Sequence, residues 1–180
     1  MKAVLKSIKP YWLYLFLIGK KSIEIVKNFP TAEDWNKRVY FYCSKDLKSF
    51  NRIPQKDQEW MIKYLGKVAC EMCCDGIDSY NYNYCTHPEI GMDYDCGDNW
   101  WEIAETDLEK ACISYEEFKS YAWNRKVVYG WVINWGLKLP EPKEISEFRF
   151  AEYKYGRIYL PPRTIKRPPQ SWCYVEEVSK

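Results

Sequence analysis

The sequence predicts a single α+β domain built on a curled sheet or a small β-barrel. Its length of 180 residues is that of one domain, which can bury a core without disulfide or metal staples. Aromatic residues make up 18% of the chain, and this favours strands and stacking surfaces. Five or six segments have the pattern of strands, and two or three have that of short helices. The composition excludes a collagen, a coiled coil and a membrane channel.

The first part of the chain combines strands with one clear helix. The expected elements are a strand at residues 1–8, a helix at 11–18, and strands at 22–27 and 39–43. Pro10 suits the first turn of the helix, and Gly19 is a good stop. Ile23 and Ile25 share one face of the second strand. The run Val-Tyr-Phe-Tyr-Cys at 39–43 is strongly β-prone, so we expect it in the centre of the sheet.

The later elements flank a long irregular segment. They are a helix around 57–64, strands at 66–77 and 127–135, a helix at 115–123 and a closing strand at 172–175. Ser114 and Glu117 have the spacing of a capping box, which marks the start of the second helix. Residues 78–105 form an irregular acidic insertion, which is either a binding loop or plain decoration. The whole chain, 1–180, is expected as one domain with this insertion.

Charge is distributed unevenly along the chain. Residues 1–52 carry a net charge of +7, residues 53–120 carry −10, and residues 121–180 carry +5. If the two basic ends meet in space, they form a basic face that can contact phosphate. The alternative is a solvated surface without a ligand.

The chain contains eight cysteines, and no secretory signal precedes them. We therefore expect reduced thiols in a cytoplasmic protein. The apolar run 11–18 is too short to cross a bilayer, and no membrane partner is expected. Cys70, Cys73, Cys85 and His87 have a spacing that allows zinc. However, Cys70 belongs to an alternating run, in which thiols behave as small buried apolar groups. No metal and no cofactor are therefore expected.

The first candidate site follows Gly19, where the helix ends and a strand begins. Lys21 lies near the mouth of the strand, and Ser22 and Glu24 project from one of its faces. A cation, a hydroxyl and a carboxylate in this order suit a phosphate and a base edge. Lys9 and Lys20 extend the basic side of this candidate cleft. The alternative is a surface strand with ordinary cross-strand charges.

Aromatic and basic residues provide two further candidates. Trp100 and Trp101, at the edge of the insertion, are expected as an exposed platform for stacking bases, whereas core positions are favoured for Trp131 and Trp172. The Pro-rich segment 153–170 is basic, and Pro presents its cations on an extended path. The ligand-binding residues expected around its end are Arg163, Arg167, Gln170 and Ser171. The alternative is that this segment is a solvated connection without a ligand.

Several motifs together resemble those of ASCH domains, which are relatives of the PUA fold. The opening resembles the family in Ser7-Ile8-Lys9-Pro10 followed by Gly19-x-Lys21-x-x-Glu24. The middle resembles it in Gly66-Lys67-Val68 and in Ser114-x-x-Glu117, and the late part in Tyr129-Gly130-Trp131. The end, Arg167-Pro168-Pro169-Gln170-Ser171-Trp172-Cys173-Tyr174-Val175, is similar to the closing motif of a phage and bacterial subgroup. The match spans most of the chain.

The resemblance implies a PUA-like barrel of five or six strands with two or three flanking helices. It also implies a cleft at Lys21 and Glu24 that receives RNA, a nucleotide or a modified nucleoside. One branch of the superfamily hydrolyses acetylcytidine with a Lys and a Thr three residues later. Here Lys21 matches the Lys, Glu24 occupies the Thr position, and Ser22 is the available hydroxyl.

Three functions follow. The first is a non-catalytic module that binds nucleic acid or a nucleotide. The second is a nucleoside-modifying or RNA-cleaving hydrolase that uses Lys21, Ser22 and Glu24. The third is a phage or mobile-element protein that blocks a host factor through its acidic residues. Those residues are Asp93, Asp95, Asp98, Glu102, Glu105, Asp107 and Glu109.

Overall fold

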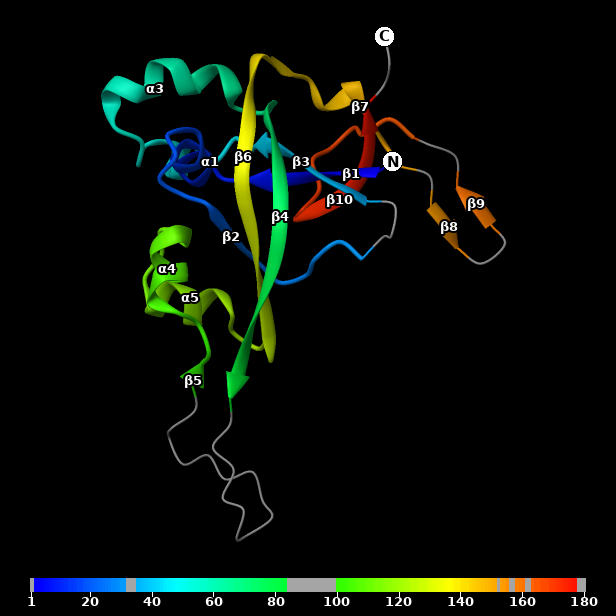
Figure 1. Ribbon diagram of the computed structural model, residues 1–180. Helices are drawn as coiled ribbons and strands as arrows, with labels where there is room; N and C mark the ends of the chain where they lie inside the picture. Colours follow the sequence, from blue (N-terminus) through cyan, green and yellow to red (C-terminus); the bar gives the residue numbers. More distant parts are fainter. Residues whose placement is uncertain are drawn as a thin grey trace, which may run out of the picture. The chain divides into compact units, whose positions relative to one another are not determined.

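The structure, a computed structural model, describes residues 2–31, 35–83, 100–151, 153–155, 158–160 and 163–177. The chain forms two compact units (Figure 1). Unit 1 comprises Met1–Gly19, Pro30–Asp75 and Ile133–Lys180, and unit 2 comprises Lys20–Phe29 and Gly76–Val132. Two long strands, β4 (Val68–Asn83) and β6 (Val127–Lys143), contribute residues to both units.

Unit 1 contains a sheet in which the described strands follow the order β6-β4-β3-β1-β10-β7. Besides β4 and β6, its strands are β1 (Lys2–Ile8), β3 (Trp35–Cys43), β7 (Phe148–Phe150) and β10 (Trp172–Glu177). A separate hairpin pairs β8 (Tyr153–Tyr155) with β9 (Ile158–Leu160). Strand β3 lies between β1 and β4, which confirms the central position predicted for residues 39–43.

The first and last strands of the chain are neighbours in this sheet. Strand β1 runs antiparallel to β10, with Ala3 opposite Val175 and Lys6 opposite Trp172. Alternate residues of the strands face the core of unit 1. That core contains Ala3, Leu5, Tyr40, Tyr42, Val68, Leu139, Phe148, Ile165 and Val175. The two basic ends of the sequence therefore meet, as the basic-face hypothesis requires.

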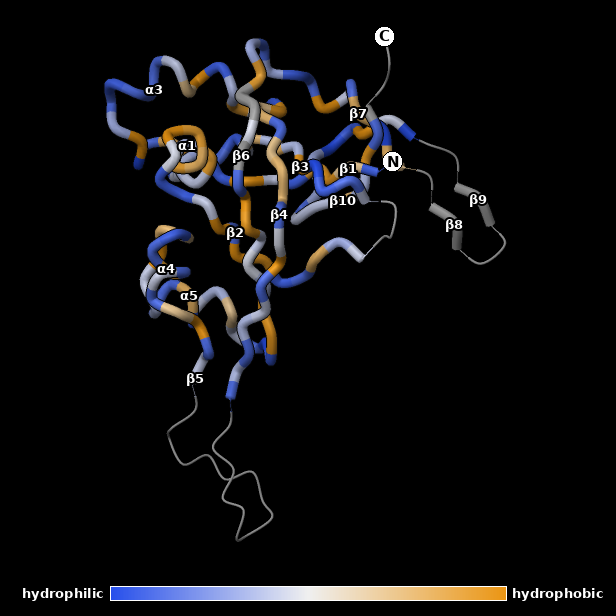
Figure 2. The backbone as a smooth tube through the Cα atoms, viewed as in Figure 1, coloured by the Kyte–Doolittle hydropathy of each residue, from blue (hydrophilic) through white to orange (hydrophobic). Residues whose placement is uncertain are grey.

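The helices of unit 1 begin and end at residues that favour helix termini. They are α1 (Pro10–Leu17), α2 (Leu47–Phe50) and α3 (Gln55–Met61), with short 3-10 turns at Ile62–Tyr64 and Ile145–Glu147. Pro10 occupies the first turn of α1, and Gly19 follows its end with a φ of 74°. The Asp46 carboxylate accepts a hydrogen bond from the Ser49 amide and caps α2. Figure 2 shows α1 as an apolar helix and α3 as a mainly hydrophilic one.

Unit 2 packs two short helices against short strand pairs. Strand β2 (Ile23–Val26) pairs with β6, and β5 (Trp100–Trp101) pairs with β4. Helices α4 (Glu105–Ala111) and α5 (Tyr115–Tyr121) lie side by side beside β5 (Figure 1). The predicted capping box is present, because Ser114 and Glu117 exchange backbone-to-side-chain hydrogen bonds of 3.1 and 2.9 Å. The core contains Ile23, Ile25, Tyr80, Trp101, Ala111, Phe118, Ala122 and Val128.

The predicted α+β class is confirmed, but the predicted small barrel is wrong. The described strands form an open sheet whose outermost members in pairing order are β2 and β7. A barrel closes only when the first and last strands of the sheet pair, and β2 and β7 do not pair in the described residues. Strands β4 and β6, of 16 and 17 residues, are also much longer than their partners. The described residues also contain five α-helices rather than two or three, since α2 and α4 carry weak sequence signals. No helix in the described ranges has the length and apolar composition needed to cross a membrane.

Candidate functional site

The Lys21 side chain, predicted as a phosphate ligand, is buried in unit 2. Its side chain is 3% exposed, and Nζ donates hydrogen bonds to the carbonyl oxygens of Ile23, at 2.6 Å, and Ala111, at 2.7 Å. A carboxylate oxygen of Glu24 lies 3.5 Å from the same nitrogen. Three oxygens thus surround an ammonium that has three N–H bonds. Lys21 therefore ties the start of β2 to the end of α4.

The Lys21 and Glu24 side chains, expected to line a ligand cleft at this point, are largely buried. Glu24 is 12% exposed at its side chain, so the pair is buried rather than partly exposed. Ser22 is half-buried, and its backbone amide donates to the Lys110 carbonyl at 2.9 Å. Lys20 is exposed, and its carbonyl accepts a hydrogen bond from the Cys112 thiol. The catalytic roles of Lys21, Ser22 and Glu24 stay predictions.

The two tryptophans of the expected platform lie in different environments. Trp100 is half exposed, whereas Trp101 is buried in the core of unit 2. The Trp101 ring packs edge-on against Phe118, with 5.3 Å between the ring centroids, and its centroid lies 5.4 Å from that of Tyr82. Because β5 is a strand, successive side chains point to opposite faces, and only Trp100 presents a face for stacking. Trp131 is buried, as expected for a core position, and Trp172 is half-buried.

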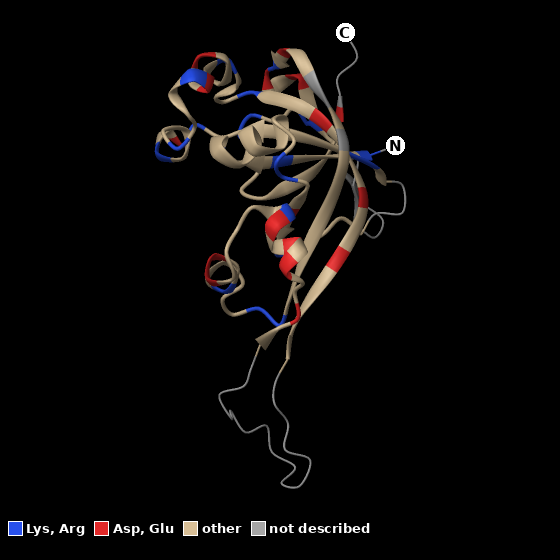
Figure 3. Ribbon diagram, turned by 60° about the vertical axis from the view of Figure 1, so that its left-hand side comes forward, with Lys and Arg blue, Asp and Glu red and all other residues tan. Residues whose placement is uncertain are grey.

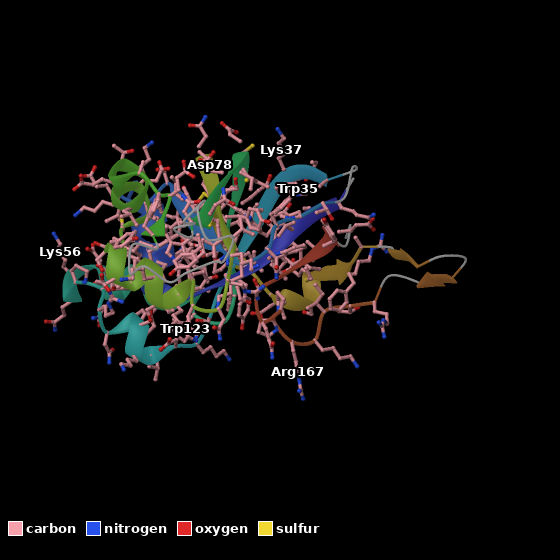
Figure 4. All side chains as sticks on the ribbon, turned by 90° about the horizontal axis from the view of Figure 1, so that it is seen from below. Trp35, Lys37, Lys56, Asp78, Trp123 and Arg167 are labelled. Carbon is pink, nitrogen blue, oxygen red and sulfur yellow. The ribbon has the colours of Figure 1, made fainter. Side chains whose placement is uncertain are left out.

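In unit 1, the basic ends of the chain form a surface that we call the chain-end surface, made of Lys9, Arg167, Gln170 and Ser171. The Ser7 hydroxyl donates to the Pro169 carbonyl at 2.6 Å, and the Ser7 amide donates to the Ser171 carbonyl at 3.0 Å. Lys9 and Arg167 each lie two residues from these bonded positions. The four side chains are exposed, and Figure 4 shows Arg167 extending away from the ribbon. The structure therefore brings together four of the predicted ligand-binding residues.

Arg163 belongs to the same Pro-rich segment as Arg167, but it precedes the chain-end surface and lies beside another strand. It is exposed, and its carbonyl accepts a hydrogen bond from the Phe150 amide at 2.8 Å, beside strand β7. The next residues bridge to β7 as well, since Thr164 pairs with Arg149. Ile165 is fully buried and anchors the segment in the core. The segment is therefore fixed along the sheet.

A cation beside Lys9 was missed by sequence reasoning. The Arg52 guanidinium lies 4.1 Å from the centroid of the Tyr11 ring and 5.2 Å from that of Trp12. Arg52 is exposed and the two rings are half-buried, so the stack faces solvent. The Tyr11 amide donates to the Ser49 hydroxyl at 3.2 Å, which holds the start of α1 against α2. No sequence signal joins residues about forty positions apart, and this stack required the structure.

The two units differ in charge. Unit 1 contains 20 Lys or Arg residues and 13 Asp or Glu residues, whereas unit 2 contains 7 and 12. Unit 1 is thus net basic and unit 2 net acidic. Figure 3 shows acidic positions as red bands along the long strands. Of the acidic residues considered for a protein partner, Asp93, Asp95 and Asp98 lie outside the described residues, and the others lie in or beside α4.

The described residues give little support to a zinc site at the cysteines. Cys70 is buried, and its burial raises the pKa of the thiol, which disfavours the thiolate that zinc binds. Cys85 and His87 lie outside the described residues. Within the described part of the chain, no group of three or more His, Cys, Asp or Glu residues is placed to hold a metal ion.

No protein-family model matches the sequence, and no curated protein matches it either. Among solved structures, the chain is similar to a crystal structure of ASCH from Zymomonas mobilis, with a TM-score of 0.51 and 12% identity over 97% of this chain and 88% of that one. A mutant of that protein gives a TM-score of 0.50 and 11% identity over 98% and 91% of the two chains. The chain therefore has the ASCH-type fold that its motifs predicted. The closer match to a phage subgroup stays a prediction.

Proposed function

We propose that this protein is a non-catalytic module that binds single-stranded RNA through unit 1. The observation that carries the proposal is the pair of hydrogen bonds from Ser7 to Pro169 and Ser171, because they join the basic ends of the chain in one surface. Arg167 supplies an exposed cation for phosphate, and so does Lys9, whose side chain is 64% exposed although its ammonium lies 3.6 Å from the Asp46 carboxylate. Gln170 and Ser171 supply polar groups for phosphate or base edges.

The Arg52 stack supports an unpaired ligand over a duplex. The Arg52 guanidinium lies over the Tyr11 and Trp12 rings, and a guanidinium plane can stack on an unpaired base, whereas paired bases are already stacked on their neighbours. The net positive charge of unit 1 supports a polyanionic partner. The ASCH-type fold, whose PUA-like relatives bind RNA, supports the same assignment.

The buried lysine supports binding rather than hydrolysis. A catalytic lysine needs an N–H or a lone pair directed at the reacting group. Lys21 instead directs hydrogen bonds at the carbonyls of Ile23 and Ala111, with the Glu24 carboxylate close by. We therefore assign Lys21 and Glu24 to the architecture of unit 2 and leave ligand contact to the chain-end surface.

Fluorescence anisotropy of labelled oligonucleotides of about 12 nucleotides tests the proposal. We expect saturable binding to single-stranded RNA and weaker binding to duplex RNA of the same length. Lys9→Gln and Arg167→Gln should each weaken binding. Each should also reduce the slope of log affinity against log salt by about 0.7, the value for one phosphate contact on a single strand.

Lys56→Gln provides the matched control. Lys56 is exposed in unit 1 at the start of α3, and Figure 4 shows it far from Arg167. Its neutralisation should leave the salt slope unchanged. If Lys56→Gln and Lys9→Gln weaken binding equally, the cations act through overall charge and the chain-end surface is not the site. Absence of saturable binding to single-stranded RNA would remove the proposed function altogether.

A further inference from the structure

Trp123 is an exposed tryptophan that none of the sites above uses. It is 74% exposed, the largest value among the large hydrophobic residues of the described chain. It lies two residues after the end of α5, and Figure 4 shows it at the surface. Leaving an indole in water forgoes the gain of burying one of the largest apolar side chains. A tryptophan at such a position is available to stack on a ligand.

The turn that carries Trp123 is firmly fixed. On one side, Ala122 is buried in the core of unit 2, and its amide donates to the Phe118 carbonyl at 2.8 Å. The Arg125 amide donates to the Ala122 carbonyl at 3.0 Å, which closes the turn. Asn124 adopts a φ of 60°, a left-handed conformation that Asn tolerates. The Lys126 carbonyl then accepts a hydrogen bond from the Tyr82 amide. The indole is thus presented on an ordered support.

A second aromatic ring and several cations surround the turn. Tyr121 is 41% exposed, and the Lys27 ammonium lies 5.0 Å from the centroid of its ring. Arg125 and Lys126 are exposed. Burial of the hydroxyl, with the nearby Glu24 carboxylate, raises the pKa of Tyr121 to about 12.

The local charge contrasts with that of the rest of unit 2. The segment from 118 to 140 contains no Asp or Glu, although unit 2 as a whole is acidic. An exposed indole among cations is the combination that single-strand binders use, since the ring stacks on a base and the cations contact the adjacent phosphates. A basic protein partner would instead meet cations at this turn. These observations favour a nucleic-acid ligand.

We propose that Trp123, with Tyr121, Lys27, Arg125 and Lys126, forms a second RNA contact, in which Trp123 stacks on an unpaired base and the cations meet its flanking phosphates. The inference rests on the proposed function, because its ligand is the single-stranded RNA that is proposed to bind unit 1. It predicts that single-stranded RNA is preferred for its accessible bases as well as for its charge.

Anisotropy titrations of Trp123→Ala with a single-stranded RNA of about 12 nucleotides test the inference. Loss of one stacked base should weaken binding about 5- to 160-fold, and Trp123→Phe should retain most of the affinity. Binding of duplex RNA should change little. The control is Ile62→Ala, which removes another exposed apolar side chain, 60% exposed, from unit 1. This control should bind as the parent chain does.

A label at the indole identifies direct contact. In protein that contains 5-fluorotryptophan, the 19F resonance missing from Trp123→Phe belongs to Trp123, and it should shift on addition of RNA. If the parent chain binds RNA but Trp123→Ala binds equally well, the inference is wrong and the proposed function stands. If the parent chain binds no RNA, both fail. A Trp123 resonance that shifts with phosphatidylcholine vesicles and not with RNA would overturn the inference in favour of a lipid surface.

Discussion

At the scale of single residues, the most informative side chain is the buried Lys21. Its side chain is 3% exposed, and its ammonium bonds to two backbone carbonyls beside the Glu24 carboxylate. Lys21→Ala leaves these oxygens buried without the cation that satisfies them. Removing one partner of a buried ion pair costs about 3–5 kcal/mol. We expect a loss near the lower end, because the Glu24 side chain keeps some contact with solvent.

Urea unfolding monitored by circular dichroism measures this loss. The matched control is Lys20→Ala, since Lys20 is the exposed neighbour and should change the free energy of unfolding by no more than about 0.5 kcal/mol. A Lys21→Ala variant as stable as Lys20→Ala would mean that the ammonium contributes nothing to the fold. Lys21 would then return as a candidate ligand residue.

At the scale of single elements, the capping box decides how α5 begins. The Ser114 hydroxyl accepts from the Glu117 amide at 3.1 Å, and the Glu117 carboxylate accepts from the Ser114 amide at 2.9 Å. Ser114→Ala removes the first bond and should cost about 1 kcal/mol in the free energy of unfolding. Ser114→Asp preserves an acceptor and should retain most of the stability. Equal losses in both variants would show that the hydroxyl acts through packing and not as a cap.

The pairing of β3 with β4 should depend on pH through Glu71. Hydrogen bonds from Arg38, at 2.6 and 2.7 Å, hold the pKa of Glu71 below its usual range. A lowered pKa means that the carboxylate stabilises the fold above the unfolded pKa of about 4.3, and that this contribution disappears as pH falls through the folded pKa. The pair is partly exposed, so its contribution is about 0–1 kcal/mol.

Glu71→Gln should therefore lower stability slightly at neutral pH and lose less stability than the parent chain between about pH 5 and pH 3. Thermal unfolding at stepped pH values measures both effects. Some acid sensitivity should remain, because the pKa values of Asp46 and Asp57 are also lowered, mainly by hydrogen bonds from Ser49 and Tyr14. Parallel pH profiles for the variant and the parent chain would show that the Arg38 pair has no role in acid unfolding.

At the scale of the whole molecule, local signals in the sequence predicted more than distant contacts did. Pro10, Gly19 and the capping box act within one turn of the chain, and the elements they delimit formed as predicted. The burial of Lys21 depends on the Ala111 carbonyl, 90 positions away, and no local pattern reports such a contact. The barrel failed for the same reason, because its closure depends on the pairing of distant strands.

In the candidate site too, the sequence predicted some features, and others depended on contacts between distant residues. The basic composition of both chain ends suggested that they meet, and the pairing of β1 with β10 brings Lys9 near Gln170 and Ser171. The aromatic residues were harder to assign, since strand alternation buries Trp101 and exposes Trp100 only once β5 is placed. The 74% exposure of Trp123 required the structure, because no local pattern in the sequence reports which side of the turn faces solvent.

The two units should also differ in their response to core substitutions. Each has its own cluster of buried residues, with Phe148 in unit 1 and Phe118 in unit 2, and both side chains are fully buried. Truncation of either ring to Ala should cost about 3–5 kcal/mol, because it removes transfer free energy and leaves a cavity. Each substitution should destabilise mainly the unit that loses the ring, because the two core clusters share no described residue.

Hydrogen–deuterium exchange followed by mass spectrometry resolves this difference. Phe118→Ala should speed exchange in β2, α4 and α5, while β1 and β10 keep the rates of the parent chain. Phe148→Ala should give the reverse pattern and serves as the matched control. The strands β4 and β6 belong to both units, so their amides should exchange faster in both variants, each at the end next to the lost ring. Uniform acceleration across the whole chain in either variant would mean that the two clusters unfold as one cooperative unit.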